Sequence, residues 1–328
     1  MVTSSVTLGF AAMKSDQSGA SCRMPKLTGT LTFTSPLALA ECAVISDSAV
    51  TAATGDITLD ALSVGSVDSL GVAVGVSFGA AGLVSGSAAA AGSIASITST
   101  NLVEALIADG SDVDATLGSV LLTAADQTAF TNNVYGVAVG GSFGGGASLA
   151  LSVAYAESSV ALDGTVRTRI SDSDVDAALD VRETALADST ITSNGKGVAV
   201  SLSGSVGFSL AGAGAGAIVN NTITQNFESD ILASNTDQSQ DVTAGGAVVL
   251  TATDSISSTA DATAASLAIS GGFTAGSIAI AAAQASNSLA GWSSAVIDNS
   301  YVRANKGALT VSANSESQLF ATPDAYAI

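Results

Sequence analysis

The chain has no histidine, only two cysteines, and few aromatic or basic residues. Among its 328 residues, 9 Lys or Arg stand against 28 Asp or Glu, and aromatic residues make up 4%. Without histidine, the usual serine or cysteine catalytic triad and the commonest metal ligand are excluded. A net charge of −19 opposes contact with nucleic-acid phosphates and anionic membrane surfaces. We therefore expect no triad hydrolase and no nucleic-acid partner.

The two cysteines, Cys22 and Cys42, both lie near the start of the chain. A small secreted scaffold held by disulfides would contain many more cysteines. These two are able to close one loop, but the sequence leaves their pairing open.

Long uncharged stretches are present, and their periodicity is that of β-strands. In the stretch from Gly71 to Ile107 the first charged residue is Glu104. From Val72 to Phe78, large residues alternate with Ala, Gly and Ser, which is a period of two and not the 3.6 of a helix. We therefore expect no transmembrane helix. Because the alternate positions carry small residues instead of charges, we expect both faces of these strands to be covered, with Val74 in the core.

Short segments centred on isoleucine recur along the chain at nearly constant spacing. AVISDS at 43–48 has counterparts at 105–110, 168–173, 229–234 and 295–300. A second alternating run, GDITLDA at 55–61, also recurs once in each unit. Such self-similarity indicates one array of stacked units instead of two separate globular domains. The anchor isoleucines, separated by 62, 63, 61 and 66 residues, are Ile45, Ile107, Ile170, Ile231 and Ile297.

These patterns predict an all-β fold, an elongated repeat array built as a β-solenoid or as stacked β-sheets. We expect residues 1–42 to form an entry or capping segment that ends in a strand at 28–34. Residues 43–328 form the array, with units starting near 43, 105, 168, 229 and 295. In the third unit Arg182 and Glu183 interrupt the apolar run, so we expect that strand to be exposed. The periodicity leaves open whether neighbouring strands run parallel or antiparallel.

One group of acidic residues is a candidate metal site. Asp172, Asp174 and Asp176 alternate, so in a strand their carboxylates would share one face, and calcium is bound by such oxygen ligands. The pattern lacks the glycine and the closing glutamate of an EF-hand loop. Solvated turn residues are therefore the competing interpretation, and no other cofactor is expected.

The motifs GVAVGVSFGAAG at 71–82, AVISDS and GDITLDA resemble the degenerate β-strand repeats of very large bacterial surface proteins. These include filamentous-haemagglutinin-like and leukotoxin-type adhesins, and the resemblance covers roughly residues 43–328. It implies an extracellular stalk, adhesin or filament segment without catalysis. It carries over no functional residue.

We therefore expect a non-enzymatic structural or adhesive protein at a bacterial cell surface. Open repeat ends predict self-association into filaments or arrays, because unpaired strand edges template further pairing. A host or cell-surface ligand is also compatible with this class. Two alternatives remain, a membrane-active β-hairpin toxin and a β-helix enzyme acting on polysaccharide.

Overall fold

The structure is a computed structural model that describes residues 6–9, 37–234 and 241–328. This part of the chain consists of strands and turns, without a helix. Accordingly, the described residues contain no helix long and apolar enough to cross a membrane. The expected strand at 28–34, Cys22 and most of the insertion in the fourth unit lie outside the described residues.

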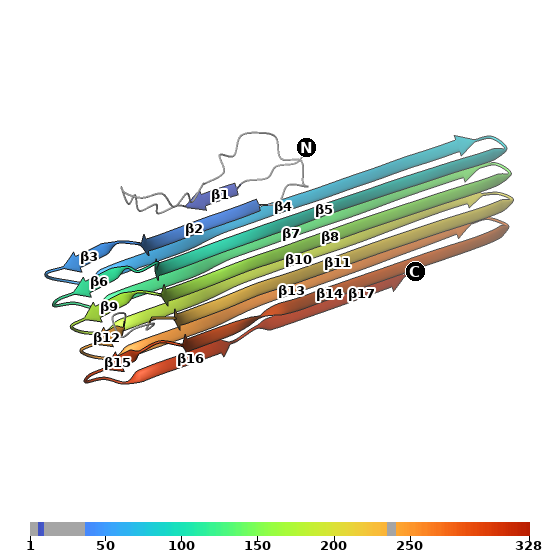
Figure 1. The fold of residues 1–328 in the computed structure, drawn as a ribbon. Helices are drawn as coiled ribbons and strands as arrows, with labels where there is room; N and C mark the ends of the chain where they lie inside the picture. Colours follow the sequence, from blue (N-terminus) through green and yellow to red (C-terminus); the bar gives the residue numbers. More distant parts are fainter. Residues whose placement is uncertain (1–5, 10–36, 235–240) are drawn as a thin grey trace.

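The strands form three sheets (Figure 1). The two long sheets, A and B, face each other, and the short sheet C lies at one end. Sheet A contains β1 (Val6–Gly9), β4 (Ile57–Ala81), β7 (Val120–Gly144), β10 (Val181–Ser205), β13 (Val248–Gly271), β16 (Leu309–Ser315) and β17 (Gln318–Ala327). Sheet B contains β2 (Leu37–Ser46), β5 (Val84–Ala108), β8 (Ala147–Ser171), β11 (Phe208–Leu232) and β14 (Thr274–Asp298). Sheet C contains the short strands β3 (Ala49–Ala52), β6 (Asp112–Ala115), β9 (Asp174–Ala177), β12 (Val242–Ala244) and β15 (Val302–Ala304).

Each repeat is one coil of a parallel β-solenoid. The chain runs along a long strand of sheet A, reverses, returns along sheet B, and crosses a short strand of sheet C into the next coil. All strand pairs are parallel except β1 with β4. The anchors Ile107, Ile170, Ile231 and Ile297 align in one column, with Ile45 before them. The predicted repeat unit is therefore confirmed, and the open question of strand direction is answered as parallel.

The body is longest along its strands. The central strands β7, β8, β10 and β11 each have 25 residues, which corresponds to about 80 Å. Successive coils are about 4.8 Å apart. Figure 1 shows the resulting slab, with the short strands of sheet C at one end and the reversals between sheets A and B at the other. We call these the wide end and the tip.

Large apolar side chains fill the wide end. Phe130 and Phe227 are almost fully buried there, among the anchor isoleucines and the inward residues of sheets A and C. Nearer the tip the core is built almost entirely from alanine, such as Ala138, Ala199 and Ala215. Sheets A and B are therefore farther apart at the wide end, where sheet C also encloses the interior, than at the tip, where only the two sheets face each other.

Glycine permits the closest approach of sheets A and B. A Cβ atom added at Gly75, Gly136 or Gly197 would lie 2.2 Å from a carbonyl oxygen of the opposite sheet. No side chain fits at that distance, so the two backbones pack directly against each other. The glycine content of the uncharged stretches thus follows from the spacing of the sheets.

The expectation that the valines of these stretches are buried is wrong. Val72, Val74, Val76 and Phe78 point outward, and Val74 is 66% exposed. The alternate residues Ala73 to Gly79 are the ones that face sheet B. The physical reason is the thin interior, which accepts only Gly, Ala or Ser.

The prediction of an exposed strand in the third unit is also wrong. β10 begins at Val181, and its inward side chains are fully buried from that residue onward. Arg182 faces solvent and pairs with Asp180, with 2.8 Å between Nη2 and Oδ2. Glu183 points into the core with no exposed surface. The strand therefore keeps its place in the sheet, and it buries a carboxyl group.

Candidate functional site

The acidic turns of the repeat motif lie at the wide end and have a structural role. Asp109 and Asp172 adopt left-handed backbone conformations with φ of 58° and 48°, as do the equivalent residues of the other coils. Aspartate tolerates this conformation better than most residues. The hydroxyl of Ser173, directly after Asp172, donates a hydrogen bond of 2.8 Å to the carbonyl oxygen of Ser171. The Ile-Ser-Asp-Ser motif is thus the sequence of a stacked, self-capped turn.

The structure separates the three predicted calcium ligands. Asp174 and Asp176 lie on the outward face of β9, whereas Asp172 belongs to the turn before that strand. The expectation that all three carboxylates share one strand face is wrong for Asp172, because its left-handed conformation breaks the alternation. Asp112 and Asp114 pair in register with Asp174 and Asp176 on the neighbouring strand β6. Within the described residues, no group of three or more acidic or cysteine side chains is arranged to hold a metal ion.

The carboxylates of sheet C repel one another. Burial, followed by the neighbouring Asp241, raises the pKa of Asp174 from 3.8 to about 6. Burial and the charges of Asp241, Asp114 and Asp112 raise the pKa of Asp176. The backbone N–H of Asp241 donates to Asp174 Oδ1 at 3.3 Å, which only partly offsets this effect. This surface is therefore a negative patch whose charge depends on pH.

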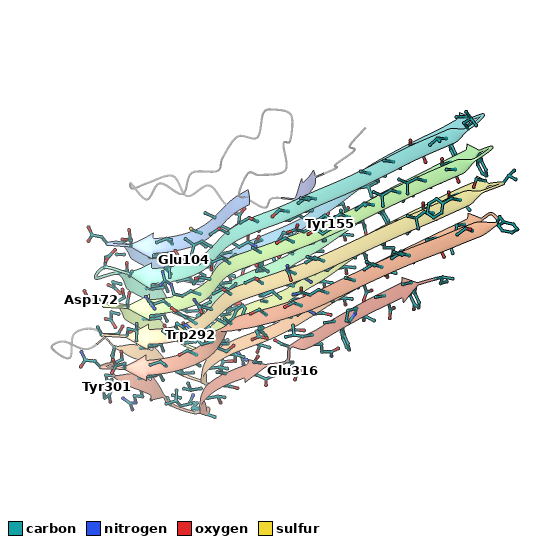
Figure 2. All side chains as sticks on the ribbon, turned by 90° about the vertical axis from the view of Figure 1, so that its right-hand side faces the viewer. Glu104, Tyr155, Asp172, Trp292, Tyr301 and Glu316 are labelled. Atoms are coloured by element: carbon teal, nitrogen blue, oxygen red, sulfur yellow. The ribbon has the colours of Figure 1, made fainter. Side chains whose placement is uncertain are left out.

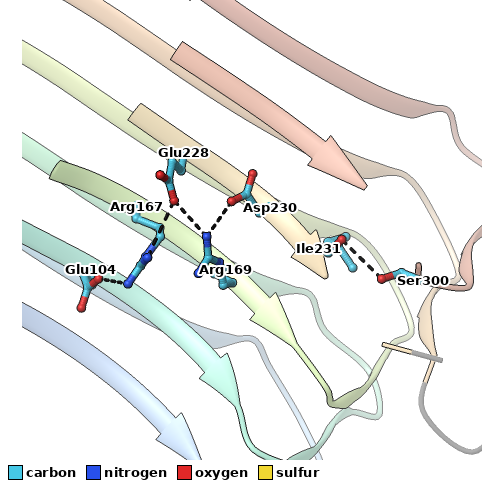
Figure 3. Close-up of polar contacts among 7 residues, drawn as sticks. All are labelled: Glu104, Arg167, Arg169, Glu228, Asp230, Ile231 and Ser300. Carbon is cyan, nitrogen blue, oxygen red and sulfur yellow. Dashed lines mark hydrogen bonds and ion pairs between the residues drawn. The ribbon is translucent and has the colours of Figure 1, made fainter. Parts of the chain in front are cut away.

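Arginine and carboxylate side chains form a network on the outer face of sheet B, near the wide end (Figure 3). Arg169 Nη2 lies 2.9 Å from an oxygen of Glu228 and 2.9 Å from one of Asp230. Arg167 pairs with Glu104 of the preceding coil, and its Nη1 lies 3.8 Å from Glu228. The network joins three successive coils through β5, β8 and β11. Its groups pair with each other, which indicates a role in fixing the register of the coils.

A second polar cluster lies inside the solenoid. Asp126 has no exposed surface and accepts hydrogen bonds from Asn101 Nδ2 at 3.1 Å and from Gln225 Nε2 at 3.3 Å. Burial raises the pKa of Asp126 by more than these hydrogen bonds lower it. The cluster links sheets A and B across the core. Like the arginine network, it holds the coils together.

Sequence reasoning missed the arginine network and the buried acids. Aligning the repeats would have placed several of these residues in shared columns. Arg169 and Asp230 each immediately precede an anchor isoleucine, so aligning the anchors places them in one column. Glu104 and Arg167 fall in a neighbouring column by the same alignment. The interior position of Glu183 follows from its column, which contains Leu122 and Leu250.

The comparisons with known proteins give no relative, since no family model, no curated protein and no solved structure matches this chain.

Proposed function

We propose that the chain is a non-enzymatic structural segment of a bacterial cell-surface or extracellular protein, with an adhesive or stalk role. The charged groups support this proposal, because they pair across coils or line turns. The observation that carries it is the in-register stacking of coils, in which each strand pairs through its backbone with the same strand of the next coil. The outer strand of such a stack accepts further coils from the same chain or from another copy.

The two outer sides of sheet B, as far as the structure describes them, share one register. In the described part of the chain, β14 is the last strand of sheet B, and β5 pairs with β2 only from Ser99 onward. No strand of the described residues pairs with positions 84–98 of β5 on the side of β2. Through the register of β8 and β11, the same columns correspond to residues 274–288 of β14 on the other side. A second copy placed head to tail would continue the sheet without a change in register.

Electron microscopy and sedimentation test this self-association. We expect the full chain to form short stacks whose length increases with protein concentration. Dispersed monomers across all salt and calcium concentrations would contradict the proposal. Any host or cell-surface ligand would be sought with the stacked form.

A single edge substitution sharpens the test. The N–H of Thr274 donates to the carbonyl oxygen of Gly207, directly before β11, so the N–H of Ala281, seven residues later, points to the opposite side, away from β11. Ala281→Pro removes that donor while the strand keeps its bonds to β11, since proline is tolerated at an edge. We expect Ala281→Pro to shorten the stacks and the control Ala281→Ser to leave them unchanged. Equal stacking of both variants would place the contact elsewhere.

A further inference from the structure

Side-chain polarity is inverted at the tip. The tip comprises residues 73–91, 136–154, 197–215 and 264–281, and these four ranges contain no charged residue. Inward positions there carry Gly, Ala and Ser, whereas large apolar residues point outward. Examples of these outward residues are Val74, Val76 and Phe78 on β4 and Val198, Val200 and Leu202 on β10. At the wide end the arrangement is the ordinary one, with Ile, Leu and Phe inside.

Some inward serines of the tip pair with one another, whereas the hydroxyls of three others have no hydrogen-bond partner, namely Ser87, Ser201 and Ser266. The Oγ atoms of Ser85 and Ser142 lie 2.6 Å apart, and those of Ser148 and Ser203 lie 2.7 Å apart. Ser209 donates to Ser203 at 3.0 Å. In the central coils the backbone groups are also paired with a strand on each side. This backbone pairing of the central coils is what a surrounding without water requires.

The apolar surface covers three sides of the tip. Val74 exposes 66% of its surface on sheet A, and Ile280 exposes 64% on sheet B. Between the sheets, Phe273 at one reversal is 95% exposed; Leu83 occupies the same place in the first coil, and Val206 lies one position earlier in the reversal of another. Figure 2 shows side chains projecting from both faces and from the reversals. Large exposed apolar side chains gathered on one part of a soluble protein are typical of a binding site.

Tyrosines and charged residues form the border of this apolar surface, at the same distance from the reversals on both faces. On sheet A, Tyr135 and Lys196 are neighbours in one outward column. On sheet B, Tyr155 donates a hydrogen bond of 2.8 Å to Glu157. Each tyrosine lies about ten residues from the reversal, or about 30 Å, which is close to the thickness of a bilayer's hydrocarbon core. Tyrosine beside charged groups is typical of a membrane interface.

We propose that the tip inserts into the apolar region of a zwitterionic lipid bilayer. A second copy of the chain would cover one flat face, whereas lipid acyl chains surround both faces and the reversals together. The net charge of −19 disfavours anionic lipid, so neutral headgroups are the favoured surface. This inference goes beyond the proposed structural role and does not depend on stacking, because it rests on outward side chains, whereas stacking uses backbone groups of β5 and β14.

Flotation with phosphatidylcholine vesicles tests the proposal. We expect the full chain to float with the vesicles, and less protein to float when part of the lipid is anionic. The tip variant Val74→Asp/Ile280→Asp is expected to lower the bound fraction at least tenfold. The control Thr192→Asp/Ser288→Asp adds the same charges to the same two faces outside the tip and is expected to float like the native chain. All four positions point outward, so an unchanged circular dichroism spectrum and melting temperature would show that the variants are folded.

Tryptophan fluorescence reports which part of the molecule enters the lipid. Trp292 is the single tryptophan and lies on sheet B toward the wide end (Figure 2). Phosphatidylcholine with brominated acyl chains is expected to leave Trp292 unquenched. It is expected to quench Phe78→Trp made in a Trp292→Phe background.

Three outcomes would overturn the proposal. They are a native chain that does not float with phosphatidylcholine, equal flotation of the tip and control variants, and binding that requires anionic lipid. A tip variant that loses only self-association, measured by sedimentation without lipid, would assign the surface to a second copy. The Ala281→Pro variant separates this result from the proposed stacking, since it is expected to float normally.

Discussion

Replacing Glu183 with leucine should stabilise the protein. Glu183 points into the core of the wide end, is fully buried, and aligns in register with Leu122 and Leu250. Neither of its carboxylate oxygens has a hydrogen-bond partner. Burial first, and then the charge of Asp230, raises its pKa well above 4.5, although nearby Thr168, the backbone of Asp230 and Arg169 oppose this. The sheet thus tolerates one carboxyl group in a column of leucines.

The size of the effect follows from two contributions. An unpaired buried polar group costs about 1–3 kcal/mol relative to its solvated state. Burial of an apolar side chain of leucine size contributes about 2 kcal/mol. Because part of the apolar gain is already made by the methylene groups of Glu183, we expect Glu183→Leu to raise the free energy of unfolding by about 2–4 kcal/mol at pH 7.

The pH dependence of stability provides an independent check. The folded-state pKa of Glu183 lies above its unfolded value, so the native state holds the proton more tightly. Its contribution to stability is therefore present below pH about 4.5 and decreases by about 1.4 kcal/mol per unit as pH rises toward the folded-state pKa. Glu183→Gln keeps the shape of the side chain but cannot ionise, so it should lack this slope.

Urea denaturation followed by circular dichroism from pH 4.5 to 8.5 measures both effects. The native chain, Glu183→Leu and Glu183→Gln are compared at equal protein concentration. A destabilised Glu183→Leu, or the same pH slope in all three proteins, would refute the assignment of a buried, unpaired carboxyl group with a raised pKa to the core.

Three further predictions concern other parts of the fold. Gly136→Ala should lower the melting temperature, because its Cβ atom would lie 2.2 Å from the carbonyl oxygen of Tyr155, and a normal melting curve would show that the sheets can separate there. Arg169→Ala should cost about 1–3 kcal/mol in urea denaturation, since it removes charged hydrogen bonds to two carboxylates; full stability would mean that solvent replaces the pairing. Asp174 has a folded-state pKa of about 6 against 3.8, so its stabilising contribution is complete below pH about 4 and is lost as pH rises to about 6. Asp174→Asn should flatten the pH profile of the melting temperature in this window, and an unchanged profile would rule out the carboxylate repulsion.

The repeat and its register were predictable from the sequence. The anchors Ile107, Ile170 and Ile231 recur because each must fill the same position in the wide end, and a stacked fold repeats its buried residues more strictly than its surface. The spacing therefore predicts the column as well as the unit. The parallel direction was not predictable, since alternation with period two is the same in both directions.

The inside and outside of the tip were not predictable from alternation alone. A strand such as Val72 to Phe78 offers one face of large residues and one of small residues, and the usual rule places the large residues inside. Here the rule fails because the opposing sheets are too close for any side chain at Gly75, and the neighbouring inward positions carry only Ala, Gly or Ser. The separation of the sheets is a tertiary property that a single strand does not encode.

Packing within the fold explains the composition of the wide end, but it does not explain the outward apolar residues of the tip. At the wide end, large apolar residues are inside and charged groups are outside, so burial, ion pairs and hydrogen-bonded turns account for the composition. At the tip, close packing of backbones accounts for the inward glycines and serines, but it places no demand on the outward residues. Thr or Asn would serve there as well, as they do in the same strand at Thr192 and Asn194. The apolar outward face therefore needs a cause outside the fold, and the vesicle experiment is the direct test of one.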